Sequence, residues 1–324
     1  MKNLIWIFSL ATIIVNAQSY PPAAGEPGST AISADSESFV AWATGISVER
    51  GHVDISNPEF EDNGSNYATY GEPENALGAA NSSAVSLGDA GEAILTFDKP
   101  VKDGTGFDFA IFENSFSDTY LELAFVEISS DGFNYFRFPS HSQTQTEVQV
   151  GGFGNVDPTY INNLAGKYRA MFGTPFDISE LEDDSLLNKN SITHIKIVDV
   201  VGSIDSEYAR YDSFGNPIND PFPTPFYSSG FDLDAVGVIH EQVLSVVENQ
   251  DIVFSIFPNP VSEILFIEVK GTVQAIVYDL QGRMILSEAI EGKGEINVSA
   301  LKSGIYIVSI SSKETRTQYR FIKE

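Results

Sequence analysis

Residues 121–138 read LELAFVEIS-SDG-FNYFRF, in which two apolar segments, Leu121 to Ser129 and Phe133 to Phe138, flank Ser130-Asp131-Gly132. Continuous or alternating apolar character over segments of this length is typical of β-strands. Asp-Gly supplies the positive φ that a tight hairpin turn needs. The stretch therefore predicts an antiparallel hairpin. Aromatic residues alternate along its second strand, and they are expected to enter the core on one face and to form cross-strand pairs on the other.

Segments of the same kind recur between residues 18 and 242, separated by clusters of Gly, Asn, Asp and Pro. They are residues 39–43, 93–97, 107–112, 192–201 and 231–239, and residues 176–181 predict a short helical insert. Few stretches have a helical period, and we find no internal repeat. The chain is therefore predicted to be all-β, with a jelly-roll-like antiparallel β-sandwich over residues 18–242.

Charge separates this region from the end of the chain. Of the 18 basic and 45 acidic residues, residues 252–324 contain 8 of each, so residues 1–251 keep 10 basic and 37 acidic residues. Nucleic acids and anionic membranes need basic side chains, so the imbalance argues against both as partners. The excess of carboxylates predicts a solvated acidic surface, or carboxylates held together by divalent cations.

The last seventy or so residues contain four ordered motifs. Phe257-Pro258-Asn259-Pro260 is followed by an apolar strand at 264–269, then by a hairpin at 273–289 that turns through 279–283. The run 296–308 contains Gly304 and Tyr306, and the chain ends in Phe321-Ile322-Lys323-Glu324. We expect Gly304 to hold a backbone shape that other residues cannot adopt.

These motifs resemble the A-type C-terminal sorting domain of the type IX secretion system of Bacteroidota. The resemblance implies a small Ig-like β-sandwich over residues 254–324, with Pro258, Asn259, Pro260, Gly304, Tyr306 and Lys323 as its signal residues. It also implies the type IX secretion machinery as a partner, and a secreted or outer-membrane cell-surface location. The motifs say nothing about the activity of residues 18–242.

The N-terminus predicts entry into the same route. Lys2 precedes an apolar run from Leu4 to Val15, and Val15 and Ala17 fit a small-residue cleavage site, so residues 1–17 are predicted to be a Sec signal peptide. The run is shorter than the roughly 20 residues that a spanning helix needs, and no transmembrane segment is expected in the mature chain. Without cysteine the chain has no disulfide, thiolate metal site or Cys nucleophile. Residues 243–253 are predicted to be a linker.

Several segments of the large domain resemble a family of uncharacterised Bacteroidota cell-surface proteins with galactose-binding-like β-sandwich folds. The matching segments are 74–78, 85–88, 108–114, 127–132 and 230–236. Members of that family sit beside surface uptake systems, including some for corrinoids. The resemblance therefore implies capture of a ligand, but it identifies none.

The candidate metal ligands are oxygen-bearing residues at the predicted strand ends and in one loop. Asp232 and Asp234 are two residues apart on a predicted strand, so both project from one face, where they repel unless a cation lies between them. The remaining candidates are Glu113, Asn114, Asp199, Asp212 and Asp220. Such a set suits Ca²⁺, which takes six to eight oxygen ligands. The alternative for each residue alone is a solvated or turn-forming side chain that bonds its own backbone.

The loop at 202–230 supplies candidate ligand-binding aromatics. Loops of this length in compact domains are usually functional or disordered, and exposed aromatics can stack on sugars or other flat ligands. The candidates are Tyr208, Tyr211, Phe214, Phe226 and Tyr227. The alternative is that they pack over an open edge of the sandwich.

No catalytic motif is present. The four histidines fall in no zinc-helix pattern, and the sequence contains no G-x-S-x-G elbow or phosphate-binding Gly loop. We therefore expect a secreted, non-catalytic binding or adhesion protein stabilised by calcium. Two alternatives stay open: a surface protein that captures a small nutrient such as a corrinoid or a glycan, and a glycoside hydrolase that uses two carboxylates.

The separate, neutral C-terminal region generates a prediction about export. Deleting residues 254–324 should leave a folded acidic domain in the periplasm, because the sorting signal and the acidic domain are predicted to have separate cores. Cell fractionation and surface protease accessibility measure this outcome. Normal delivery of the truncated protein to the surface would contradict it.

Overall fold

The computed structural model describes residues 19–242, 254–312 and 316–324. The chain divides into two compact units, Met1–Val243 and Leu244–Glu324, and each is described by itself. The predicted signal peptide (1–17) and linker (243–253) lie outside the described residues. Among the described residues, no helix is long and apolar enough to cross a membrane.

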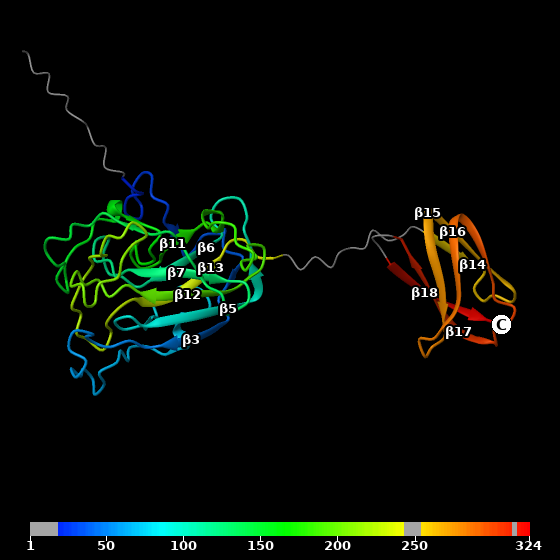
Figure 1. Cartoon of the computed structure of the whole chain (residues 1–324), viewed down its shortest axis with the longest axis horizontal. Coiled ribbons are helices and arrows are strands. Elements are labelled where there is room, and N and C mark those ends of the chain that lie inside the picture. Colours follow the sequence, from blue (N-terminus) through cyan, green and yellow to red (C-terminus); the bar gives the residue numbers. More distant parts are fainter. Residues whose placement is uncertain (1–18, 243–253, 313–315) are drawn as a thin grey trace, which may run out of the picture. The chain divides into compact units, whose positions relative to one another are not determined.

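The N-terminal unit is built from two antiparallel sheets (Figure 1). The first has the order β1 (Ile32–Ser33), β11 (Phe172–Phe176), β6 (Phe109–Glu113), β13 (Asp232–Val238) and β2 (Ala41–Trp42), and β4 (Val85–Ser86) also pairs with β13. The second has the order β3 (Gly45–Glu49), β5 (Glu92–Val101), β12 (Ile192–Asp199), β7 (Ala124–Ser129) and β8 (Phe136–Arg137). A small third sheet pairs β9 (His141–Ser142) with β10 (Ile161–Asn162), and short 3-10 helices span η1 (Pro73–Ala76), η2 (Pro158–Tyr160) and η3 (Ile178–Glu180).

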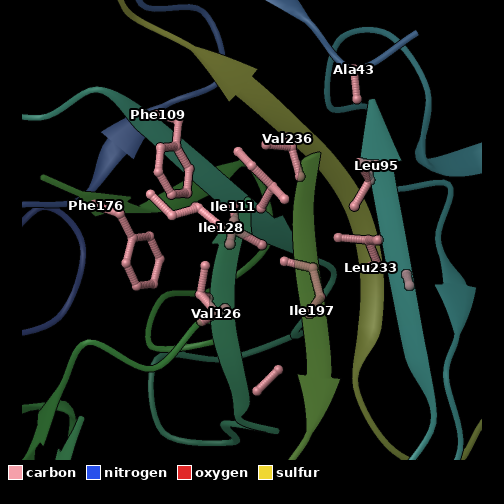
Figure 2. Close-up of a cluster of buried hydrophobic side chains, with 14 of the residues drawn as sticks. Ala43, Leu95, Phe109, Ile111, Val126, Ile128, Phe176, Ile197, Leu233 and Val236 are labelled. Atoms are coloured by element: carbon pink, nitrogen blue, oxygen red, sulfur yellow. The ribbon is translucent and has the colours of Figure 1, made fainter. Parts of the chain in front are cut away.

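The core lies between the two large sheets. Figure 2 shows Phe109, Ile111 and Val236 from the first sheet packed against Val126 and Ile197 from the second. All five are buried and belong to one hydrophobic cluster. Burial of these apolar side chains is the main term that stabilises such a sandwich. The prediction of an all-β antiparallel sandwich is confirmed.

The predicted hairpin forms between β7 and β8, but β8 begins at Phe136, three residues later than expected, so the connection is longer than a tight turn. Asp131 closes the turn, because its Oδ1 accepts the backbone N–H groups of Phe133 and Asn134, both at 2.8 Å, and Gly132 has φ +77°. Phe138 enters the core, whereas Phe133 belongs to the turn and is 88% exposed. The short helical insert expected at 176–181 is η3.

The C-terminal unit is one five-stranded antiparallel sheet. Its strands are β14 (Phe254–Phe257), β15 (Ile264–Tyr278), β16 (Met284–Asn297), β17 (Gly304–Ser311) and β18 (Arg316–Lys323), in the order β14-β15-β17-β18 with β16 on β15. The long strands β15 and β16 bend, and their register shifts between Glu268 and Thr272 (Figure 1). Leu265, Val308 and Phe321 belong to a core of its own.

The Pro258-Asn259-Pro260 segment is tied to the last strand. Asn259 Oδ1 accepts the Ile322 N–H at 2.8 Å, and the Val261 N–H donates to the Ile322 carbonyl at 2.8 Å. Lys323, at the end of that strand, is buried and pairs with Gly304. The first and last motifs of the C-terminal unit are therefore neighbours in space.

Our expectation for Gly304 is wrong. Its φ lies outside the left-handed region, and a Cβ added there would meet only ordinary contacts, at 3.8 Å from Tyr306 and 3.9 Å from Lys302. Tyr306 carries the structural role instead. Its ring stacks on Phe321 with centroids 5.7 Å apart, and its hydroxyl donates to the Lys302 carbonyl at 2.9 Å.

These contacts predict opposite outcomes for two neighbouring substitutions. Tyr306→Ala should lower the free energy of unfolding of the C-terminal unit by about 1–3 kcal/mol, because it removes a half-buried ring from Phe321. Gly304→Ala should change it by less than about 0.5 kcal/mol. Hydrogen exchange of the β17 and β18 amides in the full chain measures both effects. Equal loss of protection in the two variants would contradict the assignment.

Candidate metal and ligand site

Three acidic side chains meet at one end of the N-terminal sandwich. Glu113 is the last residue of β6, Asp232 is the first residue of β13, and Glu122 lies in the segment that leads into β7. One carboxylate oxygen from each lies within 4.8 Å of the others. Glu113 is 1% exposed, and Glu122 and Asp232 are each 8% exposed. We call these three residues the acidic triad.

Burial dominates the electrostatics of the acidic triad. It raises the pKa of Glu113 and of Glu122 well above the usual range, and the charge of Asp232 adds to both shifts. Burial also raises the pKa of Asp232, to about 7, although hydrogen bonds from Ser86 and Asn114 oppose the shift. Each pKa unit corresponds to about 1.4 kcal/mol of preference for the protonated form. The three carboxyl groups therefore cannot all be ionised at low cost unless a cation lies among them.

Polar neighbours orient the acidic triad without neutralising it. The Ser86 hydroxyl donates to Asp232, the Ser115 N–H donates to Glu113 Oε2 at 2.8 Å, and Tyr120 lines the same cavity as Glu122. With its amide nitrogen turned inward, Asn114 reaches Glu113 Oε1 at 3.3 Å and Asp232 Oδ2 at 3.2 Å. Within the described ranges, no Lys, Arg or His forms an ion pair with the triad.

Arg50 is the basic residue whose charge lowers the pKa of Asp232. Its guanidinium donates elsewhere, however. Nη1 bonds the carbonyls of Tyr70 at 2.9 Å and Ser86 at 2.8 Å, and Nη2 bonds the carbonyl of Gly71. Arg50 therefore fixes the backbone beside the site and leaves the carboxylates open.

The acidic triad lines a cavity of about 180 Å³. Aromatic rings form its rim: Phe116 and Phe153 are 74% and 71% exposed, and Phe226 is 39% exposed. The rings make a contiguous row, with Phe116 stacked on Tyr120 at 4.5 Å, Tyr120 near Phe153 at 6.2 Å, and Phe153 near Phe226 at 5.5 Å between centroids. We call this row the aromatic rim.

The prediction that Asp232 and Asp234 share a cation is not supported by the structure. The register between β13 and β6 shifts between Leu233 and Ala235, so that one extra residue interrupts the alternation of side chains. Asp234 instead accepts the backbone N–H groups of Asn81 at 3.2 Å and Ser82 at 3.0 Å. Asp232 joins Glu113 and Glu122, and Asn114 lies beside them.

The other predicted ligands bond the backbone. Asp199 accepts N–H groups from Ala90 (2.9 Å), Val201 (2.8 Å) and Phe231 (2.9 Å), and Asp220 accepts one from Leu123 (2.8 Å). Asp212 accepts N–H groups from Ser142, Phe214 and Asn216. Burial would raise the pKa of Asp212, but these bonds outweigh burial and lower it. For these residues the alternative of a backbone-bonding role describes the structure better than a metal site.

The predicted aromatic residues do not form one platform. Phe214 packs on His141 at 4.3 Å, and Tyr227 packs on Tyr70 at 5.9 Å. Tyr211 is 49% exposed, and Tyr208 is half-buried. Of the five candidates, Phe226 is the one that lines the cavity. The long loop also contributes Thr224 and Ser228 to the lining.

Sequence reasoning missed Glu122, Phe116, Tyr120 and Phe153. Glu122 had a signal, because it is an acidic residue between Leu121 and Leu123 in an apolar run. A charge at such a position is almost never fully buried unless it is paired. The rim residues come from segments far apart in the sequence, and no local pattern joins them.

A second acidic group consists of Asp103, Asp108 and Asp177, and one carboxylate oxygen from each lies within 4.8 Å of the others. Asp108 is fully buried, but its oxygens accept N–H groups from Gly104 at 2.7 Å and Ile178 at 2.7 Å, and bond His240 Nδ1 at 2.8 Å. The buried carboxylate of this group, Asp108, is therefore satisfied by the protein itself.

Comparison with known families concerns the C-terminal unit. Residues 255–324 match the family described as "Secretion system C-terminal sorting domain". The C-terminal unit is therefore a type IX sorting domain, as predicted, and the chain is exported to the cell surface or the extracellular space. A search of curated proteins gives no match.

Solved structures with similarity to the chain include the BSP domain of a biofilm-associated protein, at 12% identity over 89% of this chain and 52% of that chain, with a TM-score of 0.21. The chain is also similar to a β-glucuronidase from Parabacteroides merdae, at 12% identity over 89% of this chain and 35% of that chain, with a TM-score of 0.22. A β-glucuronidase from Ruminococcus gnavus matches at 10% identity over 76% of this chain and 38% of that chain, with a TM-score of 0.19. This chain spans about half or less of those proteins. TM-scores this low carry no argument about function.

Asp199 generates a stability prediction. Two of the amides that it binds belong to Ala90 (φ +60°) and Val201 (φ +67°), which are non-glycine residues in the left-handed region. Asp199→Ala should lower the free energy of unfolding by about 3 kcal/mol or more, because each buried amide left without a partner costs about 1–3 kcal/mol. Urea unfolding followed by the fluorescence of Trp42 measures this, with exposed Asp35→Ala as the control. Equal midpoints for the two variants would show that Asp199 is not the anchor.

Proposed function

We propose that the protein is a non-catalytic binding or adhesion module, exported by type IX secretion and stabilised by a calcium ion at the acidic triad. The observation that carries the proposal is the convergence of three buried carboxylates on one cavity, with no ion-pair partner within the described ranges. Carboxylates with strongly raised pKa values are a common mark of functional sites.

The geometry of the acidic triad fits a hard cation. Calcium binds oxygen at about 2.3–2.6 Å, so two oxygens on one ion lie at most about 5 Å apart. The triad oxygens lie within 4.8 Å of one another, and the Asn114 side-chain amide is adjacent. Glu113, Glu122 and Asp232 would hold the ion, and the open cavity leaves room for water or ligand oxygens. A cation there would join the end of β6 to the start of β13.

Two alternatives have support of their own. The aromatic rim around the cavity favours capture of a small molecule, since ligand sites combine aromatic walls with a few convergent polar groups. Two close carboxylates, one with a raised pKa, also occur in glycoside hydrolases. Ligand that stays bound through purification would favour capture. Turnover of a glycoside that Glu113→Gln abolishes would favour the hydrolase.

Calcium should stabilise the full chain at pH 8. Extracellular calcium modules bind at about 10⁻⁴–10⁻³ M, so 10 mM calcium should raise the melting temperature of the N-terminal unit by about 3–10 °C. Once residues 1–17 are removed, Trp42 is the one tryptophan left, and its fluorescence reports this unit. Glu122→Gln should melt higher than wild type in chelator, because it removes repulsion, but should lose the calcium response. Asp234→Asn, outside the triad, should keep that response.

Without calcium, the stability of the N-terminal unit should fall as pH rises. A carboxylate with a raised folded-state pKa stabilises the fold below its unfolded pKa of about 4, and that stability is lost as pH rises through the folded value, about 7 for Asp232. Chelated protein should therefore melt at a lower temperature at pH 8 than at pH 5, and calcium should help mainly at pH 8. A melt that calcium leaves unchanged at both pH values would disprove the calcium part of the proposal.

A further inference from the structure

The aromatic rim and the acidic triad together define a surface with a chemical preference. We propose that the cavity binds a neutral pyranose unit of a polysaccharide, with the sugar ring against the aromatic rim and its hydroxyl groups directed to the carboxylates. The inference rests on the proposed binding function and names the ligand class of the same site.

The first argument is exposure. Phe116 and Phe153 leave 74% and 71% of their surface in water while packing in a row with Tyr120, which is itself 8% exposed. Stacking fixes their orientation at the mouth of the cavity. An aromatic face that is held in place and exposed beside polar groups is suited to an amphipathic ring, which has apolar C–H faces and polar edges.

The second argument is the hydrogen-bonding character of the cavity. Glu122 is nine-tenths buried and lines the cavity, as Tyr120 does. A carboxyl group offers acceptor oxygens whether or not it is protonated, so it can take hydrogen bonds from a ligand. Sugar hydroxyl groups both donate and accept, so they match such a group in either protonation state.

The third argument is charge, which excludes acidic sugars. None of the residues known to line the cavity is basic, and three are carboxylates. The whole region adds repulsion at longer range, because residues 18–251 contain 9 basic and 37 acidic residues. Uronates, sulfated sugars and sialylated glycans would each place an anion against that field.

The test is calorimetric titration of the full chain with neutral hexasaccharides (cellohexaose, maltohexaose, xylohexaose and mannohexaose) and with hexagalacturonate. Titrations are run in calcium and in chelator. We expect at least one neutral hexasaccharide to bind and hexagalacturonate to bind at least tenfold more weakly. Phe153→Ala and Phe116→Ala should each weaken the neutral ligand at least tenfold. Phe133→Ala, at a residue that is 88% exposed in the β7–β8 turn, is the matched control and should bind as wild type does.

Each contrary result overturns the inference. Absence of binding by all four neutral sugars, equal or tighter binding of hexagalacturonate, or unchanged affinity in both rim variants would show that the cavity does not take a neutral sugar ring. The calcium melt is recorded on the same samples. Rim variants that lose the sugar but keep the calcium shift support both proposals. A wild-type protein with a calcium shift and no sugar binding retains the calcium site and loses this inference.

Discussion

Hydrogen bonds from backbone amides to buried carboxylates hold the N-terminal sandwich together beyond its core. Asp199 binds three amides from three separate segments, Asp108 binds two, and Asp234 binds two. Such bonds are charge-assisted and therefore stronger than those between neutral groups. They join the strands to loops that carry little regular structure. Some of the acidic residues therefore stabilise the fold directly. The sequence alone suggested more simply that they form a solvated acidic surface.

The same physics separates the structural carboxylates from the acidic triad. At Asp199, burial raises the pKa to about 6, and the three amides oppose the shift. At Glu122 the cause after burial is repulsion by neighbouring carboxylates, and no backbone amide opposes it among the causes of the shift. A buried carboxylate without amide donors needs a proton, a metal ion or a ligand. This difference singles out Glu122 as the member of the triad that backbone amides do not stabilise.

The sequence predicted the elements better than it predicted their meeting points. Apolar runs and the Asp-Gly turn are local signals, so the strands and the hairpin at 130–132 could be predicted. The sequence placed Asp232 and Asp234 on one face of a regular strand, but the bulge between Leu233 and Ala235 depends on the register of β13 against β6, which no local pattern encodes. Glu113 and Asn114 were found because a strand visibly ends there. Glu122 and Phe153 join the site only through the fold.

The two units divide the work of the chain, and their charges reflect this division. The sorting domain is neutral and has its own core around Leu265, Val308 and Phe321, so changes to the acidic triad should leave export unaffected. The acidic unit stores repulsion among Glu113, Glu122 and Asp232. Any cation or hydroxyl-rich ligand that relieves this repulsion binds the folded state better than the unfolded chain, so binding and stability are coupled. If a cation occupies the triad, the unit is most stable where that cation is abundant, which is outside the cell.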